Sequence, residues 1–511
     1  MSILQPQLYI NDIMAQTNYT DPYGGTTYID PVALAYTHKN DHIYFGSSTF
    51  VGDHSLQEFW TDLVEIEVQI RAGVSNPKFP DRNINVAVGH GMMAISDPWY
   101  NANTSNYSTA NGVVMFADAQ GFKNSQGNQG VGRYFYGLTS YANHRNLGGH
   151  LFINSDRAVA SSQGGFVIMN LGGGDGLFVN NHHDDALSGS SNFKARALAM
   201  GCGRIVVGDY LTHPGSNQSN SSLWSTGAVW IYDSWGKPIK RLQSEQIEQN
   251  DDYASTAYFG SIVAVGSGRI VVIESDEAGQ ADNGTGVATI YDIDGNVINT
   301  ISGMTIFGRL ASYSAAQVST FAFGGYWVIP SGKERSVAIG DGRIVIGCPQ
   351  WQGFNVTGGL EGIALMFDLD GNFIRFIFTP NSEYLTGTNL KEQFGTQVAI
   401  GNGRIYIGSQ NYPGNGVVGS DENGAMYVFD LEGDYLFEYH EKNENYPDVD
   451  TDFPHNMAAR DGLIVACDAY DQLNVGWKAR VRKTRLGATA STSSTSFVRH
   501  VRQRSILEAL E

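Results

Sequence analysis

An internal repeat constrains the fold of this chain more than any other feature of its sequence. Its clearest copy holds two short segments rich in β-branched residues, Val398–Ile400 and Arg404–Ile407, on either side of Gly401-Asn402-Gly403. Gly and Asn adopt the positive φ angles that a two-residue hairpin turn requires. A third segment follows at Ala425–Asp430, and another Gly turn leads on to a fourth. Four antiparallel strands in about 55 residues make one blade of a β-propeller.

The repeat occurs eight times along the 511 residues. Further copies begin at Ala199, Val263 and Val337, weaker ones at Val86 and Leu151, and degenerate units are Val32 with His42 and Met457 with Leu463. We predict an all-β chain that folds as a single β-propeller of seven to eight four-stranded blades. The number stays open because the first and last segments share one blade in many propellers, which would bring residues near 30 beside residues near 480. An open solenoid is the competing architecture, and it would need capping units.

Both ends of the chain differ from the repeats in composition. We divide the chain into an N-terminal arm at 1–29, a β-propeller at 30–485, and a flexible linker with an amphipathic tail at 486–511. A tail helix this short is not stable alone, so we expect it to dock on a partner or on the acidic body, with a frayed tail as the alternative. The candidate partner-binding residues of the tail are Phe497, Arg499, Val501, Arg502, Arg504, Leu507 and Leu510.

Dipeptides at the start of several copies indicate a family. Phe259-Gly260 and Phe394-Gly395 precede segments that end in Gly-x-Gly, and Tyr136-Gly137 is a variant of the same dipeptide. In this the chain resembles FG-GAP repeat proteins, which form the propellers of the integrin-α type. The resemblance implies the fold. That family often binds calcium through a loop of alternating Asp and Asn, but here the turn is only Gly-x-Gly-Arg and lacks the carboxylates that calcium needs.

Charge and cysteine content exclude several classes of function. The formal net charge of -19 argues against a nucleic-acid-binding surface, which needs clustered Lys and Arg. The three cysteines, Cys202, Cys348 and Cys467, are odd in number and are predicted to be buried free thiols. The start of the chain does not resemble a signal peptide, and no stretch is apolar enough to cross a membrane, so we expect a soluble protein.

Acidic and histidine-containing segments are the candidates for chemistry. Repeated Asp-Gly segments such as Asp292–Asn296 and Asp368–Asn372 are interpreted as hairpin turns rather than calcium loops. His182-His183-Asp184-Asp185, Glu274–Glu277 and Asp448–Asp452 are interpreted as solvated loops, with metal or cation binding as the alternative. No catalytic motif occurs in a supporting context. We predict no catalytic residues, no metal, no cofactor and no enzymatic activity.

These observations lead to three functional hypotheses. The first is a non-enzymatic virion protein, of a bacteriophage tail, neck or capsid surface, whose arms bind other virion proteins and whose copies form a symmetric homo-oligomer. It would act in structure or host attachment, without nucleic-acid binding or membrane insertion. The second is a free-standing extracellular or cell-surface adhesin that stacks host glycans on loop aromatics such as Trp99, Tyr100, Trp224, Trp351 and Tyr412. The third, an enzyme acting at the central channel, is not favoured because no set of catalytic residues stands out.

Overall fold

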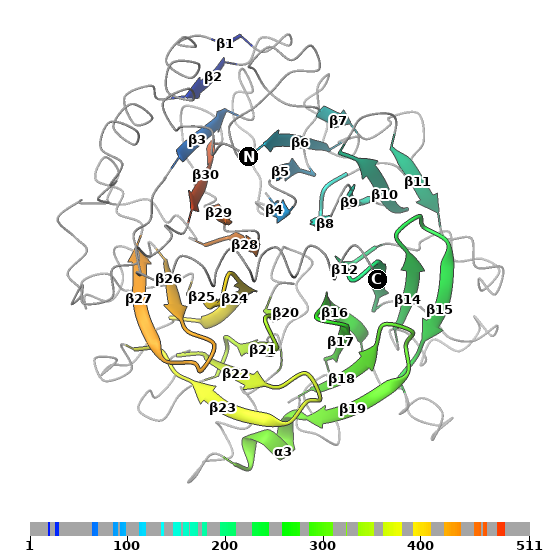
Figure 1. The fold of residues 1–511 in the computed structure, drawn as a ribbon, viewed down its shortest axis with the longest axis vertical. Coiled ribbons are helices and arrows are strands. Elements are labelled where there is room, and N and C mark those ends of the chain that lie inside the picture. Colours follow the sequence, from blue (N-terminus) through cyan, green and yellow to red (C-terminus); the bar gives the residue numbers. More distant parts are fainter. Residues whose placement is uncertain are drawn as a thin grey trace, which may run out of the picture.

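The repeats form antiparallel sheets in the computed structural model of the chain (Figure 1). Every statement below refers to the residues that the structure describes, which are 19–20, 26–29, 64–69, 85–89, 92–98, 112–118, 134–136, 147–154, 157–162, 164–171, 176–180, 195–210, 227–244, 258–275, 286–309, 323, 336–351, 361–380, 392–409, 424–440, 454–460, 463–467 and 478–485. These residues form seven sheets, six of which have four strands.

The six four-stranded sheets are numbered 1 to 6 in chain order. Sheets 1 and 2 contain β4 (Asn85–Gly89), β5 (Met92–Asp97), β6 (Val113–Asp118) and β7 (Tyr134–Tyr136), then β8 (Leu151–Asn154), β9 (Arg157–Ser162), β10 (Gly165–Asn170) and β11 (Leu177–Asn180). Sheets 3 and 4 contain β12 (Ala197–Gly201), β13 (Arg204–Asp209), β14 (Ala228–Asp233) and β15 (Pro238–Leu242), then β16 (Phe259–Gly266), β17 (Arg269–Glu274), β18 (Val287–Asp292) and β19 (Val297–Ser302).

Sheets 5 and 6 follow a short helix, α3 (Gly303–Phe307), which begins directly after β19. They contain β20 (Val337–Gly340), β21 (Arg343–Cys348), β22 (Ile363–Phe367) and β23 (Phe373–Ile377), then β24 (Phe394–Gly401), β25 (Arg404–Ser409), β26 (Ala425–Phe429) and β27 (Tyr435–His440). Each of the six sheets starts at its innermost strand and proceeds outward in chain order, as a propeller blade does (Figure 1).

The seventh sheet joins segments from both ends of the chain. Its strand order is β1 (Tyr19–Thr20), β2 (Thr26–Ile29), β3 (Val64–Gln69), β30 (Lys478–Arg485), β29 (Leu463–Cys467) and β28 (Asn456–Arg460). The prediction that residues near 30 lie beside residues near 480 is therefore corrected, because β3 stands between them: Ile66 pairs with both Ile29 and Val481. The degenerate unit at Val32 and His42 lies outside the described residues.

The sheets surround a common centre, around which their innermost strands neighbour one another in the order β4, β8, β12, β16, β20, β24 and β28, with β28 beside β4 (Figure 1). Glycine makes this close approach feasible. A Cβ atom on Gly266 would lie 2.4 Å from the carbonyl oxygen of Ile339, and one on Gly401 would lie 2.3 Å from that of Ala459. The first Gly of the Gly-x-Gly turn thus sets the spacing of neighbouring sheets at the centre.

The predicted hairpin turns are confirmed. The two central residues of each turn, such as Ser267 with Gly268 and Asn402 with Gly403, have positive φ angles of 49° and 74°, and of 61° and 73°. Two consecutive positive φ values belong to the type I′ turn, whose twist matches that of the flanking strands. The strands β16 and β17 and the strands β24 and β25 pair directly across these turns.

The Phe residue of the Phe-Gly dipeptide connects its sheet to the preceding one. Phe394 forms a parallel bridge with Gly362, which precedes β22 of the sheet before it, and Phe259 does the same with Gly227. Between sheets 1 and 2 the equivalent bridge joins Gly112 to Leu147, so Tyr136, which ends the outermost strand β7, does not take the place of this dipeptide. Apolar side chains fill the space between sheets, as where Met366 and Ile377 of sheet 5 meet Tyr427 of sheet 6.

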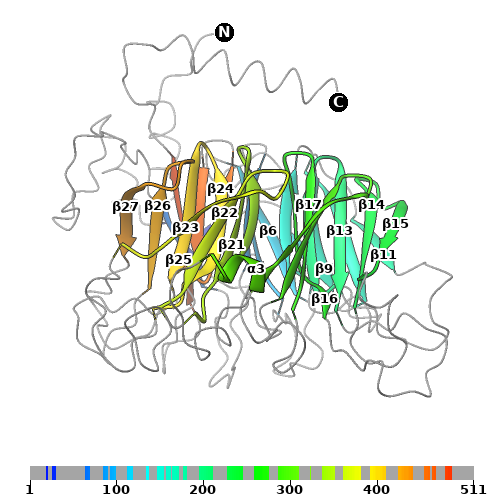
Figure 2. The same ribbon diagram turned by 90° about the horizontal axis from the view of Figure 1, so that it is seen from below.

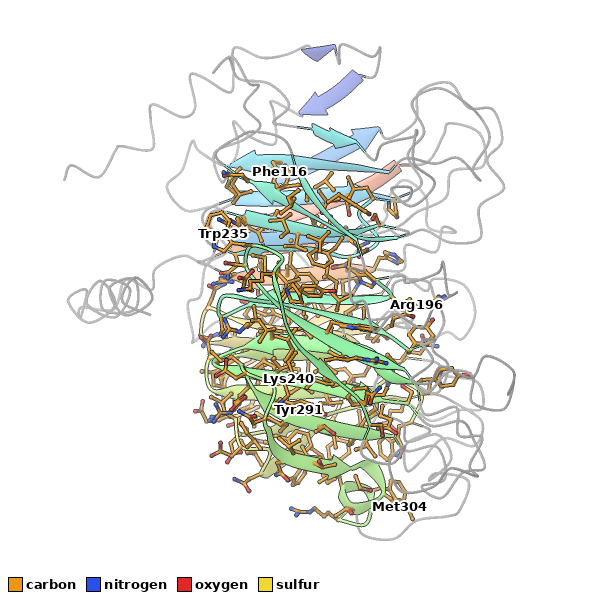
Figure 3. All side chains as sticks on the ribbon, turned by 90° about the vertical axis from the view of Figure 1, so that its right-hand side faces the viewer. Phe116, Arg196, Trp235, Lys240, Tyr291 and Met304 are labelled. Atoms are coloured by element: carbon orange, nitrogen blue, oxygen red, sulfur yellow. The ribbon has the colours of Figure 1, made fainter. Side chains whose placement is uncertain are left out.

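The disc has two different faces. In sheets 3 to 6 short turns join the first strand to the second and the third to the fourth, and they define the short-turn face. The opposite ends of these strands define the loop face. Figure 2 shows the disc edge-on, with the strands running between the two faces. In Figure 3, Trp235 of a short turn and Arg196 at the start of β12 lie on opposite sides of the disc.

Candidate functional site

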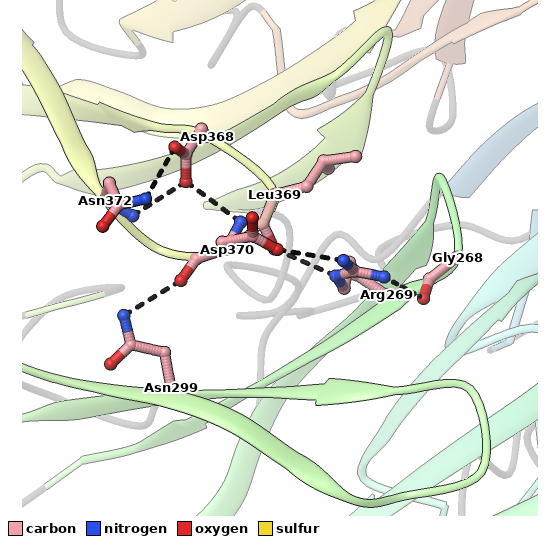
Figure 4. Close-up of polar contacts among 7 residues, drawn as sticks. All are labelled: Gly268, Arg269, Asn299, Asp368, Leu369, Asp370 and Asn372. Atoms are coloured by element: carbon pink, nitrogen blue, oxygen red, sulfur yellow. Dashed lines mark hydrogen bonds and ion pairs between the residues drawn. The ribbon is translucent and has the colours of Figure 1, made fainter.

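A repeated contact on the short-turn face joins sheets 2 to 6 in succession. Arg269, at the start of β17, donates 3.0 Å hydrogen bonds to the carbonyl oxygen of Leu369 and to a carboxylate oxygen of Asp370, in the turn before β23 (Figure 4). Asn299 of β19 donates to the carbonyl oxygen of Asp370 at 2.9 Å. Two strands of sheet 4 therefore hold one turn of sheet 5, an arrangement that we call the arginine latch.

Equivalent arginines continue the arginine latch from sheet 2 to sheet 6. Each arginine begins the second strand of its sheet and donates to a backbone carbonyl of the next sheet: Arg157 to Ser234 (2.6 Å), Arg204 to Ile293 (3.0 Å), Arg269 to Leu369 (3.0 Å) and Arg343 to Leu431 (2.9 Å). Arg157 also lies over the Trp235 ring, with its guanidinium carbon 3.2 Å from the ring centroid.

The acidic turns that receive the arginines are closed by their own first aspartate. One carboxylate oxygen of Asp292 accepts the backbone N–H groups of Asp294 and Asn296, and the other accepts the Asn296 amide. The backbone hydrogen bond from Asn296 lowers the pKa of Asp292 most, followed by that from the Asn296 side chain. Because these donors occupy both oxygens, the interpretation as hairpin turns is confirmed.

A completely buried carboxyl group, that of Glu392, lies at the boundary of sheets 5 and 6. Glu392, which precedes β24, is 0% exposed. Its Oε1 accepts hydrogen bonds from the hydroxyl groups of Thr379, just after β23, and Tyr427 of β26, at 2.8 and 2.5 Å. Its Oε2 is buried and makes no hydrogen bond within the described structure. We call Glu392, Thr379, Tyr427 and the nearby Glu361 the buried acid cluster.

Backbone contacts place the second acid of the cluster. Glu361 is 5% exposed and directly precedes Gly362, the bridge partner of Phe394, and its carbonyl oxygen accepts the Phe394 N–H at 3.0 Å. Burial raises the pKa of Glu361 to about 7. Burial is also the largest cause that raises the pKa of Glu392 to about 7, and the charges of Glu361 and Glu438 add to it, whereas the Tyr427 and Thr379 hydroxyls oppose it.

The buried acid cluster can hold and release a proton near neutral pH. Burial without a cationic partner favours the neutral form of a carboxyl group. Glu392 and Tyr427 are both fully enclosed, so this arrangement gives a substrate no access to either oxygen. A change in the protonation of this cluster therefore acts on the boundary between the two sheets and not on a bound substrate.

A second buried acid repeats part of this arrangement between sheets 3 and 4. Glu274, at the end of β17, is 5% exposed and its Oε2 accepts a 2.8 Å hydrogen bond from Ser244, which lies two residues after β15. The interpretation of Glu274 and Ser275 as part of a solvated loop is wrong, because both are buried. The sequence signal for these acids is their position: each stands at the end of an apolar strand or just before one.

Most sequence-predicted sites lie outside the described residues. This holds for the tail residues Phe497, Arg499, Val501, Arg502, Arg504, Leu507 and Leu510, for His182-His183-Asp184-Asp185, and for Asp448–Asp452. Trp351, considered as a glycan-stacking loop residue, is instead completely buried in the core of sheets 4 and 5. All three cysteines are free; Cys348 and Cys467 are buried as predicted, but Cys202 is exposed because it occupies a short turn.

Within the described part of the chain, no three His, Cys, Asp or Glu side chains gather closely enough to hold a metal ion. None of the described helices has the length and apolar character needed to span a membrane.

Comparisons with known proteins find similarity at the level of the fold alone. No family model matches the sequence, and no curated protein matches it. Among solved structures, the N-terminal domain of Nup159 is 9% identical, with 80% of this chain and 91% of that chain covered and a TM-score of 0.39. A Trypanosoma rangeli sialidase is 11% identical, with 79% and 54% covered and a TM-score of 0.35. Phage phi92 endosialidase is 8% identical, with 81% and 68% covered and a TM-score of 0.34.

These neighbours are β-propeller proteins. They correct one prediction. The sequence was expected to encode a protein without enzymatic activity, but a sialidase and an endosialidase are among the structures that this chain resembles. The fold thus gives no ground for excluding an enzyme, and a likeness at this level assigns no reaction to the chain.

Proposed function

We propose that this chain is a structural and binding protein of a virion, at a bacteriophage tail, neck or capsid surface. Its FG-GAP-type propeller has seven blades, and the pairing of β3 with β30 closes the ring. The terminal segments attach the short-turn face to neighbouring virion proteins, while the loop face is presented outward for host attachment. The observation that carries this proposal is the direction in which both terminal segments leave the seventh sheet.

The register of the seventh sheet defines that direction. Arg485, the last residue of β30, pairs with Leu463, the first residue of β29, and Leu463 follows the short turn after Arg460. Arg485 therefore lies at the short-turn face. Strand β2 is antiparallel to β3, and β1 is antiparallel to β2, so Tyr19, the first residue of β1, lies at the end of its strand nearer the same face.

The arginine latch supports a role as a rigid platform. It joins four successive pairs of sheets on the same face from which the terminal segments leave. A load that reaches any one of sheets 2 to 6 would be spread over the others, because the arginine latch bonds these five sheets in succession. Rigid elements present binding loops with less loss of conformational entropy than a flexible scaffold would.

Assembly is the property that tests this proposal. We expect the purified full-length chain to form a symmetric homo-oligomer, seen as a defined mass in light scattering and as rings or stacks in negative-stain electron microscopy. Deletion of 487–511 is expected to leave a folded disc with an unchanged circular dichroism spectrum and the mass of a monomer. The matched control replaces 411–423, which connects β25 to β26 at the loop face, with a Gly/Ser linker and should assemble normally.

Either of two outcomes would refute the assembly role. The first is a full-length chain that stays monomeric at high concentration and with the other proteins of its particle. The second is a truncated chain that assembles as the full-length chain does. A glycan array probed with the same preparations separates the adhesin alternative, since glycan binding by a monomeric disc would favour it.

A further inference from the structure

The boundary between sheets 5 and 6 is packed with apolar side chains except at its loop-face end. Val345, Met366 and Ile377 of sheet 5 meet Phe394 and Tyr427 of sheet 6. The rings of Phe394 and Tyr427 contact edge to face, with 5.4 Å between their centroids. We call this packed boundary the seam. The buried acid cluster lies at the loop-face end of the seam. Thr379 follows the last residue of β23 and Glu392 precedes the first residue of β24, and both of these strand ends are at the loop face.

Glu392 is held from both sides of the seam. Thr379, from sheet 5, and Tyr427, from sheet 6, donate to the same oxygen, Oε1. The backbone carbonyl of Glu392 accepts a 2.6 Å hydrogen bond from the Ser409 hydroxyl, at the end of β25. The residue therefore cannot move away from the seam without breaking three hydrogen bonds. Its second oxygen, Oε2, is enclosed without a hydrogen bond, which a charged carboxylate tolerates poorly.

Among the described residues, the titratable groups that act on the pKa of Glu392 are acidic or phenolic. They are Glu361, before β22, Glu438 of β27 and Tyr427 of β26. Glu438 pairs with Tyr427 in the register of β26 and β27, so it comes from the outer side of sheet 6. Glu361 comes from sheet 5, across the seam. An ionised Glu392 would face like charges from both sheets, and each would disfavour its charged form.

We propose that the seam between sheets 5 and 6 is a pH-sensitive closure, which is intact while Glu392 carries a proton and loosens when this carboxyl group ionises. The ionised group gains stability by reaching water, and parting Thr379 of sheet 5 from Tyr427 of sheet 6 would give it that access. The loop-face end of the seam is then the place where the disc opens first.

The direction of the pH effect follows from the two states. In the closed seam the pKa of Glu392 is raised from 4.5 to about 7, and in the open seam it returns to its ordinary value. The closed seam thus binds more protons than the open one between these values. Its stability is complete below pH 4.5, is lost as the pH rises from 4.5 to 7, and stays low above pH 7.

Hydrogen–deuterium exchange of the full chain, followed by mass spectrometry, tests the proposal. Exchange is measured between pH 5 and pH 8 and corrected for the intrinsic pH dependence of amide exchange. We expect protection of the β22 and β26 amides to fall by about tenfold or more over this range, since one pKa unit corresponds to a tenfold change in the opening equilibrium. Protection of the β13 amides, in sheet 3, should change far less.

Variants decide whether Glu392 is responsible. Glu392→Gln keeps an oxygen for Thr379 and Tyr427 but cannot ionise, so it should remove most of the pH dependence of the seam. The matched control, Glu274→Gln, alters the buried acid between sheets 3 and 4 and should leave the response of the seam unchanged. If Glu392→Gln retains the full pH dependence, or if the wild-type seam shows none, the proposal is wrong.

Two further variants keep the test decisive if Glu392→Gln does not fold. Tyr427→Phe removes a hydroxyl that lowers the pKa of Glu392, so the midpoint of seam opening should move to higher pH. Glu361→Gln removes a charge that raises it, so the midpoint should move to lower pH. A midpoint that both variants leave in place would overturn the assignment to this cluster.

Discussion

The side-chain amide of Asn456 donates a 2.6 Å hydrogen bond to Oδ1 of Asn85, a residue 371 positions earlier in the chain. Asn456 begins β28 of the seventh sheet, and Asn85 begins β4 of sheet 1. The Asn85 amide in turn donates to the carbonyl oxygens of Gly148 and Gly149, at 3.1 and 2.8 Å, ahead of sheet 2. Two buried asparagines therefore connect three sheets at the point where the ends of the array meet.

Replacement of either asparagine should destabilise the protein. We expect Asn85→Ala to lower the free energy of unfolding by about 1–3 kcal/mol, because buried carbonyl and amide groups lose their partners. Asn456→Ala should cost less, since it removes one of the three hydrogen bonds described here. Urea denaturation measures both, with the exposed Thr300→Ala as the control, expected to change stability by less than about 0.5 kcal/mol. Equal costs for the three variants would contradict this account.

Two glycines of one turn should respond differently to substitution. A Cβ on Gly266 would meet the Ile339 carbonyl oxygen of the next sheet, whereas a Cβ on Gly268 would meet nothing within 4 Å. We expect Gly266→Ala to cost about 2–3 kcal/mol through overpacking. Gly268→Asn should cost less than about 1 kcal/mol, since Asn tolerates the positive φ of this position. Thermal unfolding of the two variants checks the order, and the reverse order would refute the role of close approach.

The arginine latch should depend more on its backbone contact than on its ion pair. The Asp370 carboxylate in the pair with Arg269 is largely exposed, so Asp370→Asn should cost less than about 1 kcal/mol, and less still in high salt. Arg269→Leu also removes the hydrogen bond to Leu369 and should cost about 1–2 kcal/mol. A double-mutant cycle in urea separates the two contributions. An Asp370→Asn cost equal to that of Arg269→Leu would show that the ion pair dominates.

The backbone register that joins the chain ends pairs acidic residues with basic ones. Glu67 of β3 pairs with Arg480 of β30, and Glu65 pairs with Arg482. We expect Glu67→Lys to lower the stability by up to about 1 kcal/mol, because like charges then stand opposite each other. The added change Arg480→Glu should restore most of the loss, as measured by thermal unfolding at low salt. Absence of rescue would argue against this pairing.

Thiol reactivity should distinguish the three cysteines. Cys202 is exposed in a short turn, whereas Cys348 and Cys467 are buried, and burial raises the pKa of Cys348 well above its ordinary value. We expect one thiol of the native chain to react quickly with a disulfide reagent and all three to react in denaturant. Cys202→Ser should abolish the fast reaction, and a fast reaction that persists in this variant would show that a buried thiol is accessible.

The repeated strands and their turns were predictable because their causes are local. Short β-branched runs on either side of Asn402-Gly403 specify a hairpin through backbone sterics alone, and Asp292 closes its own turn within four residues. The Phe-Gly dipeptide was recognised as a mark of the repeat at residues 259 and 394. Its contact with the preceding sheet could not be inferred from the repeat pattern. Between sheets 1 and 2 the pattern assigns this contact to Tyr136, but in the structure Leu147 makes it.

The sequence by itself determined the period, the strands and the turn types, since these depend on side chains a few residues apart. Tertiary structure alone decided which distant residues meet. It set β3 rather than residues near 30 against β30, buried Trp351, and brought Glu361 and Glu392 to one seam. These outcomes depend on how neighbouring sheets pack and on the water that packing excludes, and no pattern within a single repeat encodes either.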